Sequence, residues 1–243
     1  MNLPVLQADC SQCFALCCVL LPFQKGESFP ETKPSGVPCH NLDDRDRCGI
    51  HATLREDGWS GCVAFDCFGA GQQVAQVTYG GVSWREGGNL GEMAAVLSVM
   101  RQLHEMLALL DEAVRRSAGP AGPWLERVVG LVGGTPEELL ALDIDQLRLE
   151  VGAVLGEASR GVRAHWTDAL DLTGQDLAGR DLRELDLRGA ALRGAVLLGA
   201  DLRGCDLTDA DLLGADLRGA DARGAELSEA LFLTVAQRAV LRV

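Results

Sequence analysis

Aromatic residues are scarce in this chain of 243 residues: they make up 5% of it, with a single tyrosine. A core with so few rings has to be built mainly from Leu, Val and Ala. Basic residues are also in the minority, because 22 Lys and Arg stand against 35 Asp and Glu, for a formal net charge of −13. No segment forms a basic patch, so we expect no direct binding to nucleic acid.

Long apolar runs are missing as well. The uncharged stretch SQCFALCCVLLPFQ before Lys25 is too short and too interrupted to span a bilayer, which predicts no membrane contact. The first 20 residues contain no Lys or Arg, so the basic region of a secretory signal is lacking. A cytoplasmic protein is the expectation, and the length favours two or three modules.

Catalytic motifs are the third absence. The glycines of FGAGQQ and TYGGVSW fit neither G-x-G-x-x-G nor G-x-x-x-x-G-K-[ST], and no G-x-S-x-G occurs. His104 and Glu105 lack the second histidine of a zinc-protease helix, so His104 is interpreted as a helix-surface or core histidine. His165 is interpreted as a packing residue. The sequence predicts no catalytic residue and no enzyme.

Three regions that differ in composition and periodicity predict three modules. Residues 1–88 are rich in Cys and Gly with little periodicity, residues 89–168 have helical periodicity, and residues 169–243 form a repeat. In the middle region, apolar residues recur every three or four positions from Met93 to Val114, with Asn89 and Glu92 as a capping pair. Further helices are expected over 123–132, from Thr135-Pro136 onward, and over about 146–165. Together they form a predicted α-helical connector.

The last region repeats in fives without interruption. From Leu170 it reads LDLTG, QDLAG, RDLRE, LDLRG, AALRG, AVLLG, ADLRG, CDLTD, ADLLG, ADLRG, ADARG, AELSE, ALFLT, thirteen units in one register. Leu occupies the centre of eleven units, and the residue before the centre is acidic in ten. Such strictness is typical of a stacked repeat rather than a helix, whose apolar stripe would wind around the surface at this period.

This pattern resembles the pentapeptide-repeat family. The resemblance implies a right-handed quadrilateral β-helix with twenty residues per coil, so that Leu172, Leu192, Leu212 and Phe232 form one inward column. Ala190, Ala210 and Ala230 would fill corners, and Cys205 would be a core residue. Both ends of a solenoid need caps, for which we expect the helix at 146–165 and the tail VAQRAVLRV.

Eight of the nine cysteines lie within the first 67 residues. In a protein without export signals, clustered thiols favour metal ligation over disulfides. The order C-x2-C-x3-C-C, PCHNL, RCGIH, GC and FDC resembles the CxxCxxCC family of zinc- or iron-chelating domains, although the second spacing is three rather than two. The predicted metal ligands are Cys10, Cys13, Cys17, Cys18, Cys39, Cys48, His51, Cys62 and Cys67, and His40 is a further candidate to replace a cysteine. Zinc, iron or an iron-sulfur cluster would suit them, in one or two sites.

Taken together, these features predict an α+β protein of several parts that binds metal and serves as a scaffold for a protein partner. Two alternatives remain open from the resemblances. Some pentapeptide proteins imitate DNA and protect the topoisomerase gyrase from poisons; here Arg183, Arg203 and Arg223 would lie beside Asp181, Asp201 and Asp221 and neutralise them. An iron-sulfur enzyme related to lysine methylases is the other. The sequence indicates neither the partner nor the oligomeric state.

Overall fold

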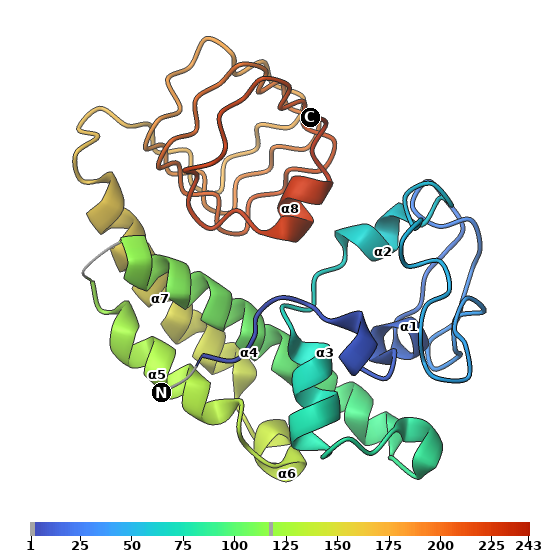
Figure 1. Cartoon of the computed structure of the whole chain (residues 1–243). Coiled ribbons are helices and arrows are strands. Elements are labelled where there is room, and N and C mark those ends of the chain that lie inside the picture. The colour runs from blue at the N-terminus through green and yellow to red at the C-terminus, as the bar shows by residue number, and fades with distance from the viewer. Residues whose placement is uncertain (1–2, 117–118) are drawn as a thin grey trace. The chain divides into compact units, whose positions relative to one another are not determined.

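The computed structural model describes residues 3–116 and 119–243, which divide into two compact units. The first contains Met1–Asp111 and Ala121–Ala153, and the second Glu112–Pro120 and Val154–Val243. The three modules expected from composition stay a prediction. The helices in chain order are η1 (Cys10–Gln12), α1 (Leu16–Leu20), α2 (Ser60–Ala64), α3 (Ala70–Gln72), η2 (Gln73–Thr78), η3 (Trp84–Glu86), α4 (Leu90–Arg116), α5 (Ala121–Leu131), α6 (Pro136–Leu140), α7 (Ile144–Arg163) and α8 (Val235–Ala239) (Figure 1).

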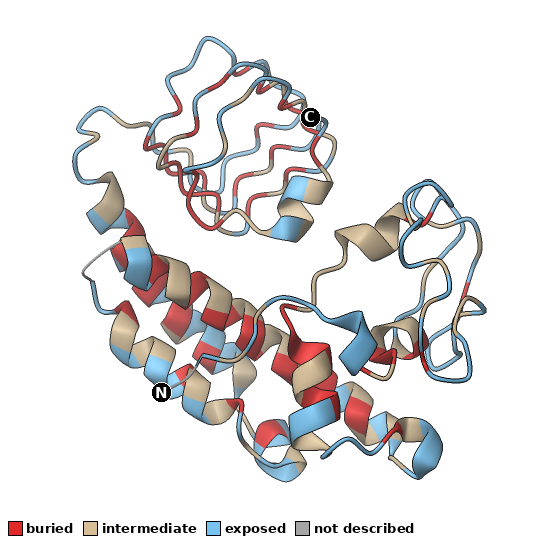
Figure 2. Cartoon of the chain, viewed as in Figure 1, coloured by how far each residue is buried: buried red, intermediate tan, exposed pale blue. Residues whose placement is uncertain are grey.

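The predicted helices of the middle region are confirmed as α4 to α7. Asn89 Oδ1 accepts the backbone N–H of Glu92 at 3.2 Å, but the Glu92 carboxylate accepts from the Tyr79 hydroxyl instead of returning to Asn89. Thr135 and Glu138 form a full capping box at the start of α6. The periodic residues of α4 from Met93 to Leu110 are buried, whereas Val114 is exposed (Figure 2).

By length and mean hydropathy, 1.3 over its apolar window, α4 is long enough and apolar enough to cross a membrane. Half of that window is buried within the structure, and the buried core helix of a globular protein would meet the same criteria of length and hydropathy. The expected lack of membrane contact therefore stays a prediction.

The second unit contains the repeat, whose units stack at intervals of twenty residues. Single parallel bridges join residue pairs such as Asp171 with Ala191 and Ala191 with Asp211. Backbone hydrogen bonds of 2.8 to 3.1 Å run from one coil to the next, mostly between residues 19 or 21 apart that flank each bridged pair, for example from the Leu192 N–H to the Asp211 carbonyl. The predicted coil length is confirmed.

The described residues of the repeat form no continuous β-strand, and neighbouring coils pair through isolated bridges. The physical reason is the short period. Each unit has room for about two extended residues before a tight turn, and most turns end on a glycine with positive φ, such as Gly194 at +64°. Each unit can then form one bridge with the coil above it and one with the coil below it.

The interior of the coils follows the predicted columns. Leu192, Leu212 and Phe232 are buried, and Leu172 in the first coil is half-buried (Figure 2). Ala190 and Cys205 are also buried, so the assignment of Cys205 to the core is confirmed.

The acidic residue of each unit has a structural role that the sequence pattern left unexplained. In all ten units that carry one, its carboxylate accepts the backbone N–H of the residue two positions later, at 2.7 to 3.3 Å. Such a bond fixes a turn locally, because the side chain replaces a backbone acceptor. The acidity of the repeat is therefore part of its fold.

Helix ends within the second unit contact one edge of the repeat. Asp209, which replaces the usual turn glycine at φ +57°, accepts from Arg116 Nη2 at 2.7 Å and from Trp166 Nε1 at 3.0 Å. Arg163 Nε donates to the Gly189 carbonyl at 2.6 Å, one coil away from Asp209. These contacts follow the side of the coils, and the capping role expected for the helix at 146–165 stays a prediction.

The tail after the last unit pairs with the preceding coil. Arg242 donates its backbone N–H to the Ala220 carbonyl at 2.9 Å and accepts from the Ala222 N–H at 2.8 Å. The side chain of Gln237 in α8 donates to the carbonyls of Leu212 and Ala215. The tail thereby satisfies backbone groups that a bare last coil would expose.

The leucine columns predict a contrast between two neighbouring residues. Leu197 is fully buried in its column, and Leu198 is 45% exposed. Leu197→Ala should lower the free energy of unfolding by about 2–5 kcal/mol, because it opens a cavity in a packed core, and Leu198→Ala should cost far less. Chemical denaturation followed by circular dichroism measures both values. Equal losses would contradict the inward register.

The turn carboxylates predict sensitivity to acid. Hydrogen bonds from Arg188 and Arg203 lower the pKa of Asp186 and Asp201 from 3.8 to about 2 in the folded chain. A lowered folded-state pKa contributes stability above the unfolded value, and this contribution disappears as the pH falls from about 4 to about 2. The free energy of unfolding should therefore drop over that range.

The matched control for this effect is the double variant Asp186→Asn and Asp201→Asn. Asparagine retains an oxygen for the backbone N–H but has no titrating group. Its unfolding free energy should depend less steeply on pH between 4 and 2. A slope identical to that of the unmodified chain would show that these carboxylates do not govern the acid response.

Candidate metal centre

All nine predicted metal ligands line one cavity of about 400 Å³ in the first unit. They are Cys10, Cys13, Cys17, Cys18, Cys39, Cys48, His51, Cys62 and Cys67. The remaining wall is mostly apolar and includes Phe23, Phe29, Trp59 and Phe65. The rings of Phe23 and Phe29 stack at 4.5 Å, and Trp59 meets both edge-on. Segments as far apart in sequence as residues 10 and 67 thus converge on the same space.

The first four cysteines reach the cavity through a strained turn. Asp9 caps η1, which begins at Cys10, and both Phe14 and Ala15 then adopt left-handed backbone angles of φ +49° and +53°. Such a conformation costs on the order of 1 kcal/mol or more for a residue with a side chain and persists only where the surroundings enforce it. The turn leads directly into α1, where the sulfurs of Cys17 and Cys18 lie 3.8 Å apart.

A glycine permits the close approach of Cys13 and Cys67. A Cβ at Gly71 would lie 2.9 Å from Cys13 Cβ, which is shorter than any real contact. The same point is 3.8 Å from the Cys13 sulfur and 3.9 Å from the Cys67 sulfur. The absence of a side chain at Gly71 therefore leaves room for two sulfurs at the base of α3.

The loop with Cys39 and Cys48 is tied to α1 by its backbone. The Cys39 N–H donates to the Cys18 carbonyl at 3.1 Å, and a bridge pairs Leu42 with Cys48. His51 follows in the next turn, its N–H directed to the Cys48 carbonyl at 3.4 Å. These bonds bring the second half of the cysteine set against the first.

Electrostatics at the cavity disfavour thiolates in the absence of a cation. Burial, with a smaller contribution from Cys10, raises the pKa of Cys13 to about 12, and burial together with neighbouring thiols raises that of Cys62 to about 12. A hydrogen bond from Cys17 lowers the pKa of Cys18, with a further contribution from Lys33. A metal ion reverses this balance, because a coordinated thiol loses its proton.

Lys33 is a buried cation next to the thiols that sequence reasoning missed. The residue is 4% exposed, and its ammonium donates to the carbonyls of Val19, Pro34 and Val37 at 2.8 to 3.1 Å. All three acceptors are uncharged, so its positive charge is available to the neighbouring sulfurs. Burial lowers the pKa of Lys33, whereas charge on Cys39 and Cys18 would raise it.

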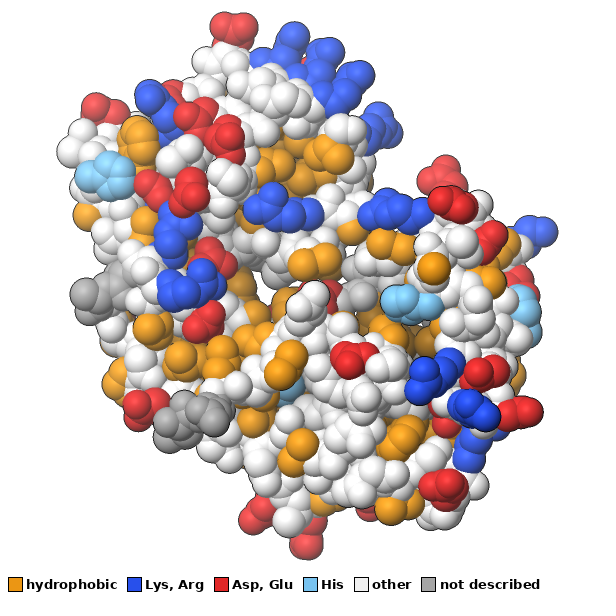
Figure 3. Space-filling model, in the orientation of Figure 1, with side chains coloured by type: hydrophobic (Ala, Val, Ile, Leu, Met, Phe, Trp, Pro, Cys, Tyr) orange, Lys and Arg blue, Asp and Glu red, His pale blue; other side chains and the backbone are white. Residues whose placement is uncertain are grey.

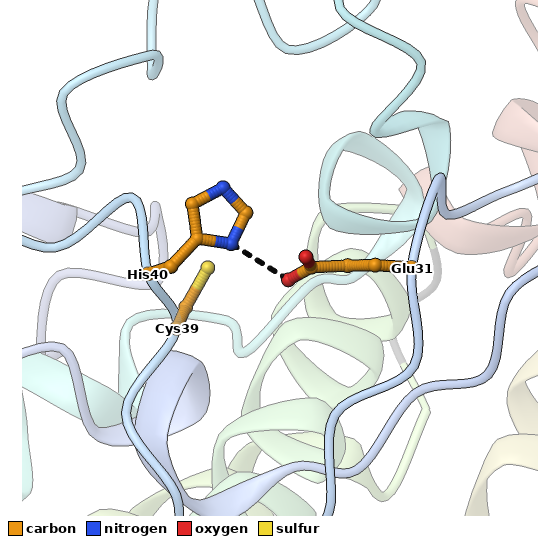
Figure 4. A group of neighbouring side chains, drawn as sticks. All are labelled: Glu31, Cys39 and His40. Carbon is orange, nitrogen blue, oxygen red and sulfur yellow. Dashed lines mark hydrogen bonds and ion pairs between the residues drawn. The ribbon is translucent and has the colours of Figure 1, made fainter.

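The distances between possible ligand atoms distinguish a compact group of three residues from the cysteines that line the cavity. Among the described residues, the group of three whose ligand atoms lie within 4.8 Å of one another is Glu31, Cys39 and His40 (Figure 4). The Cys17 and Cys18 sulfurs lie 3.8 Å apart, but among the described residues no three of the sulfurs that line the cavity form such a group. Coordination of an ion there would require their side chains to rotate inward. Glu31 was not predicted, because it lies outside every cysteine motif.

The remaining singled-out residues lie elsewhere. His104 is fully buried in α4 and its Nδ1 lies 2.7 Å from the Phe68 carbonyl oxygen, which confirms it as a core residue. His165 contacts the Trp166 ring at 4.8 Å, and its side chain is 61% exposed. All nine cysteines are free.

Comparison with known proteins identifies the repeat. Residues 171–209 and 205–232 match the pentapeptide repeats family, with eight copies. The C-terminal region of the chain is therefore a pentapeptide-repeat region. The resemblance of the N-terminal cysteines to the CxxCxxCC family stays a prediction.

Two relatives illustrate the likeness. The chain is 46% identical over 165 residues to uncharacterized protein YybG of Bacillus subtilis (strain 168), a match that covers 65% of this chain and 59% of YybG. The chain therefore spans less than two thirds of that relative's length. A pentapeptide repeat protein from the Arabidopsis thaliana thylakoid lumen, known from a crystal structure, is 41% identical over 27% of this chain and 49% of its own, with a TM-score of 0.16.

The position of Lys33 predicts an effect on metal affinity. Lys33→Met removes the buried charge, and groups that surround metal ligands typically change affinity by about 10- to 100-fold. Metal titration should therefore give the variant a dissociation constant at least about tenfold higher than that of the unmodified chain. Lys25→Met, at an exposed lysine of the same segment, is the matched control. Equal affinities in both variants, with both folded by circular dichroism, would contradict a role for Lys33.

Proposed function

We propose that the protein is a metal-binding scaffold in which the N-terminal thiols hold zinc or an iron-sulfur cluster. The observation that carries this proposal is the convergence of eight cysteines and His51 on one cavity. Thiolate and imidazole are ligands that suit zinc and iron-sulfur clusters, whereas hard ions such as magnesium prefer oxygen. Cysteines at such density in one wall have no comparable use as apolar packing, for which Leu or Val would serve.

Charge supports the same proposal. Four thiolates around one divalent ion carry an excess negative charge, and the buried ammonium of Lys33 is placed to offset part of it. A buried lysine without such a neighbour would be costly to keep ionised. The eight sulfurs are enough for one four-sulfur site with spare thiols or for two such sites.

We further propose that metal binding completes the fold around the cavity. Little regular structure surrounds it, since η1, α1 and α2 are three to five residues long. Short helices of this kind are marginal on their own, and a metal contributes its binding free energy to folding. The repeat region would then serve as a right-handed β-helical platform for a protein partner in the cytoplasm, with no reaction of its own.

The surface charge of the repeat favours a scaffold over DNA imitation. Arg183, Arg203 and Arg223 each form a 2.6 to 2.7 Å ion pair with the aspartate two residues earlier, and the first two also approach an aspartate of the next coil. Both signs of charge are visible on the face seen in Figure 3. A surface that gyrase would accept in place of duplex DNA needs a continuous negative field, which such pairs weaken.

A second candidate function rests on the cavity itself. Its volume of about 400 Å³ and its aromatic wall of Phe23, Phe29, Trp59 and Phe65 fit the size and lining of small-molecule sites. An iron-sulfur enzyme that binds a small cofactor beside its cluster would use such a space. It predicts a coloured protein that carries an organic ligand after purification.

The test is elemental analysis with an absorption spectrum of protein purified without air. We expect about one or two zinc atoms per chain, or iron with a visible absorption band for a cluster. Replacing both Cys17 and Cys18 by serine should remove at least half of the metal. Cys205→Ser is the matched control, because Cys205 lies in the repeat core. A metal-free protein that is fully folded would refute the proposal.

A further inference from the structure

A second group of ligands lies at the outer edge of the cavity wall. His40 Nδ1 is 2.8 Å from Glu31 Oε1, and these atoms and the Cys39 sulfur lie within 4.8 Å of one another (Figure 4). The side chains of His40 and Glu31 are 61% and 39% exposed. Cys39, in contrast, also lines the cavity. The Cys39 sulfur therefore belongs both to this group and to the lining of the cavity.

We propose that Glu31, Cys39 and His40 form an entry site for a divalent cation of the zinc class, from which the ion passes into the cavity through Cys39. This inference rests on the proposed function, since it assigns the route by which the thiol centre is loaded.

The chemistry of the three ligands fits such an ion. Oxygen, nitrogen and sulfur donors together match zinc, and a site with three protein ligands keeps its fourth position open to water. Two zinc ligands at about 2.1 Å each would be roughly 3.4 Å apart in a tetrahedral arrangement. Glu31 and His40 need to separate only slightly from their present 2.8 Å to admit the ion. The exposed ring can move its proton to the other nitrogen through solvent.

An open site of three ligands exchanges its ion more readily than a closed site of four thiolates. On binding at this site, Cys39 would release its proton to solvent. If the ion then moved inward, it would keep its charge of +2 and its bond to Cys39, each further cysteine that bound would also release its proton to solvent, and the water, His40 and Glu31 would dissociate. The Glu31–His40 hydrogen bond then re-forms. No oxidant or reductant takes part.

The ordinary alternative is that Glu31 and His40 form a surface pair with no ligand. Exposed pairs of this kind contribute little to stability, so the pair by itself gives the fold little benefit. The presence of a cysteine sulfur in the same group, on the side of the cavity, is what distinguishes this pair from other surface contacts.

The experiment follows zinc uptake by the full-length, metal-free, reduced protein with Zn²⁺ alone as the probe. The variant carries Glu31→Gln and His40→Ala, and the single variant His40→Ala replaces it if the double variant does not fold. The control carries Glu27→Gln and His165→Ala, because Glu27 is an exposed acid of the same loop region and the His165 side chain is also 61% exposed.

We expect the Glu31/His40 variant to load the cavity about tenfold more slowly, with the same final amount of tightly bound zinc, and the control to load like the unmodified chain. Equal loading rates in variant and control would overturn the entry site while leaving the thiol centre intact. If the unmodified chain binds one loosely held zinc that the variant lacks, and no tightly held zinc, the cation site stands and the proposed function fails.

Discussion

Thiols that line one small cavity repel one another once they ionise, and this constraint governs the N-terminal part of the chain. Burial and neighbouring thiols raise the pKa of Cys13 and Cys62, so the cysteines around the cavity do not all lose their protons unless a cation neutralises them. The chain nevertheless brings them together, at the cost of left-handed backbone at Phe14 and Ala15 and a position that only glycine can occupy at Gly71. A bound metal ion would turn this unfavourable arrangement into a source of folding free energy.

The repeat region solves the problem of stability by another means. Its columns of leucine and alanine exclude water along the whole axis, and each acidic side chain secures the turn that follows it. Coils of identical length then stack with backbone hydrogen bonds in register. These packing and hydrogen-bond terms come from the repeat's own residues. The two compact units therefore depend on different physical terms.

The repeat shows how much a strict period can predict. Four units of five residues make one coil of twenty. Because every unit has the same length, this is enough to assign Leu192, Leu212 and Phe232 to one column. Helices α4 and α7 were predictable for the same kind of reason, since apolar spacing is a local signal. The absence of continuous strands was not predicted, because it depends on how few residues each turn leaves extended.

The cysteine module was predictable in kind rather than in detail. Density and spacing pointed to shared ligation, and the nine residues do line one cavity. Sequence spacing could not show that Lys33 is buried beside them or that Glu31 lies against His40, since both contacts depend on loops without periodicity. Contacts between irregular segments are specified by the tertiary fold alone.

The most direct measurement of the central claim is X-ray absorption at the metal edge of protein purified without air. The account predicts a first shell dominated by sulfur at about 2.3 Å, with at most a minor contribution from lighter atoms. A first shell of oxygen and nitrogen alone, or the absence of any metal in folded protein, would contradict it.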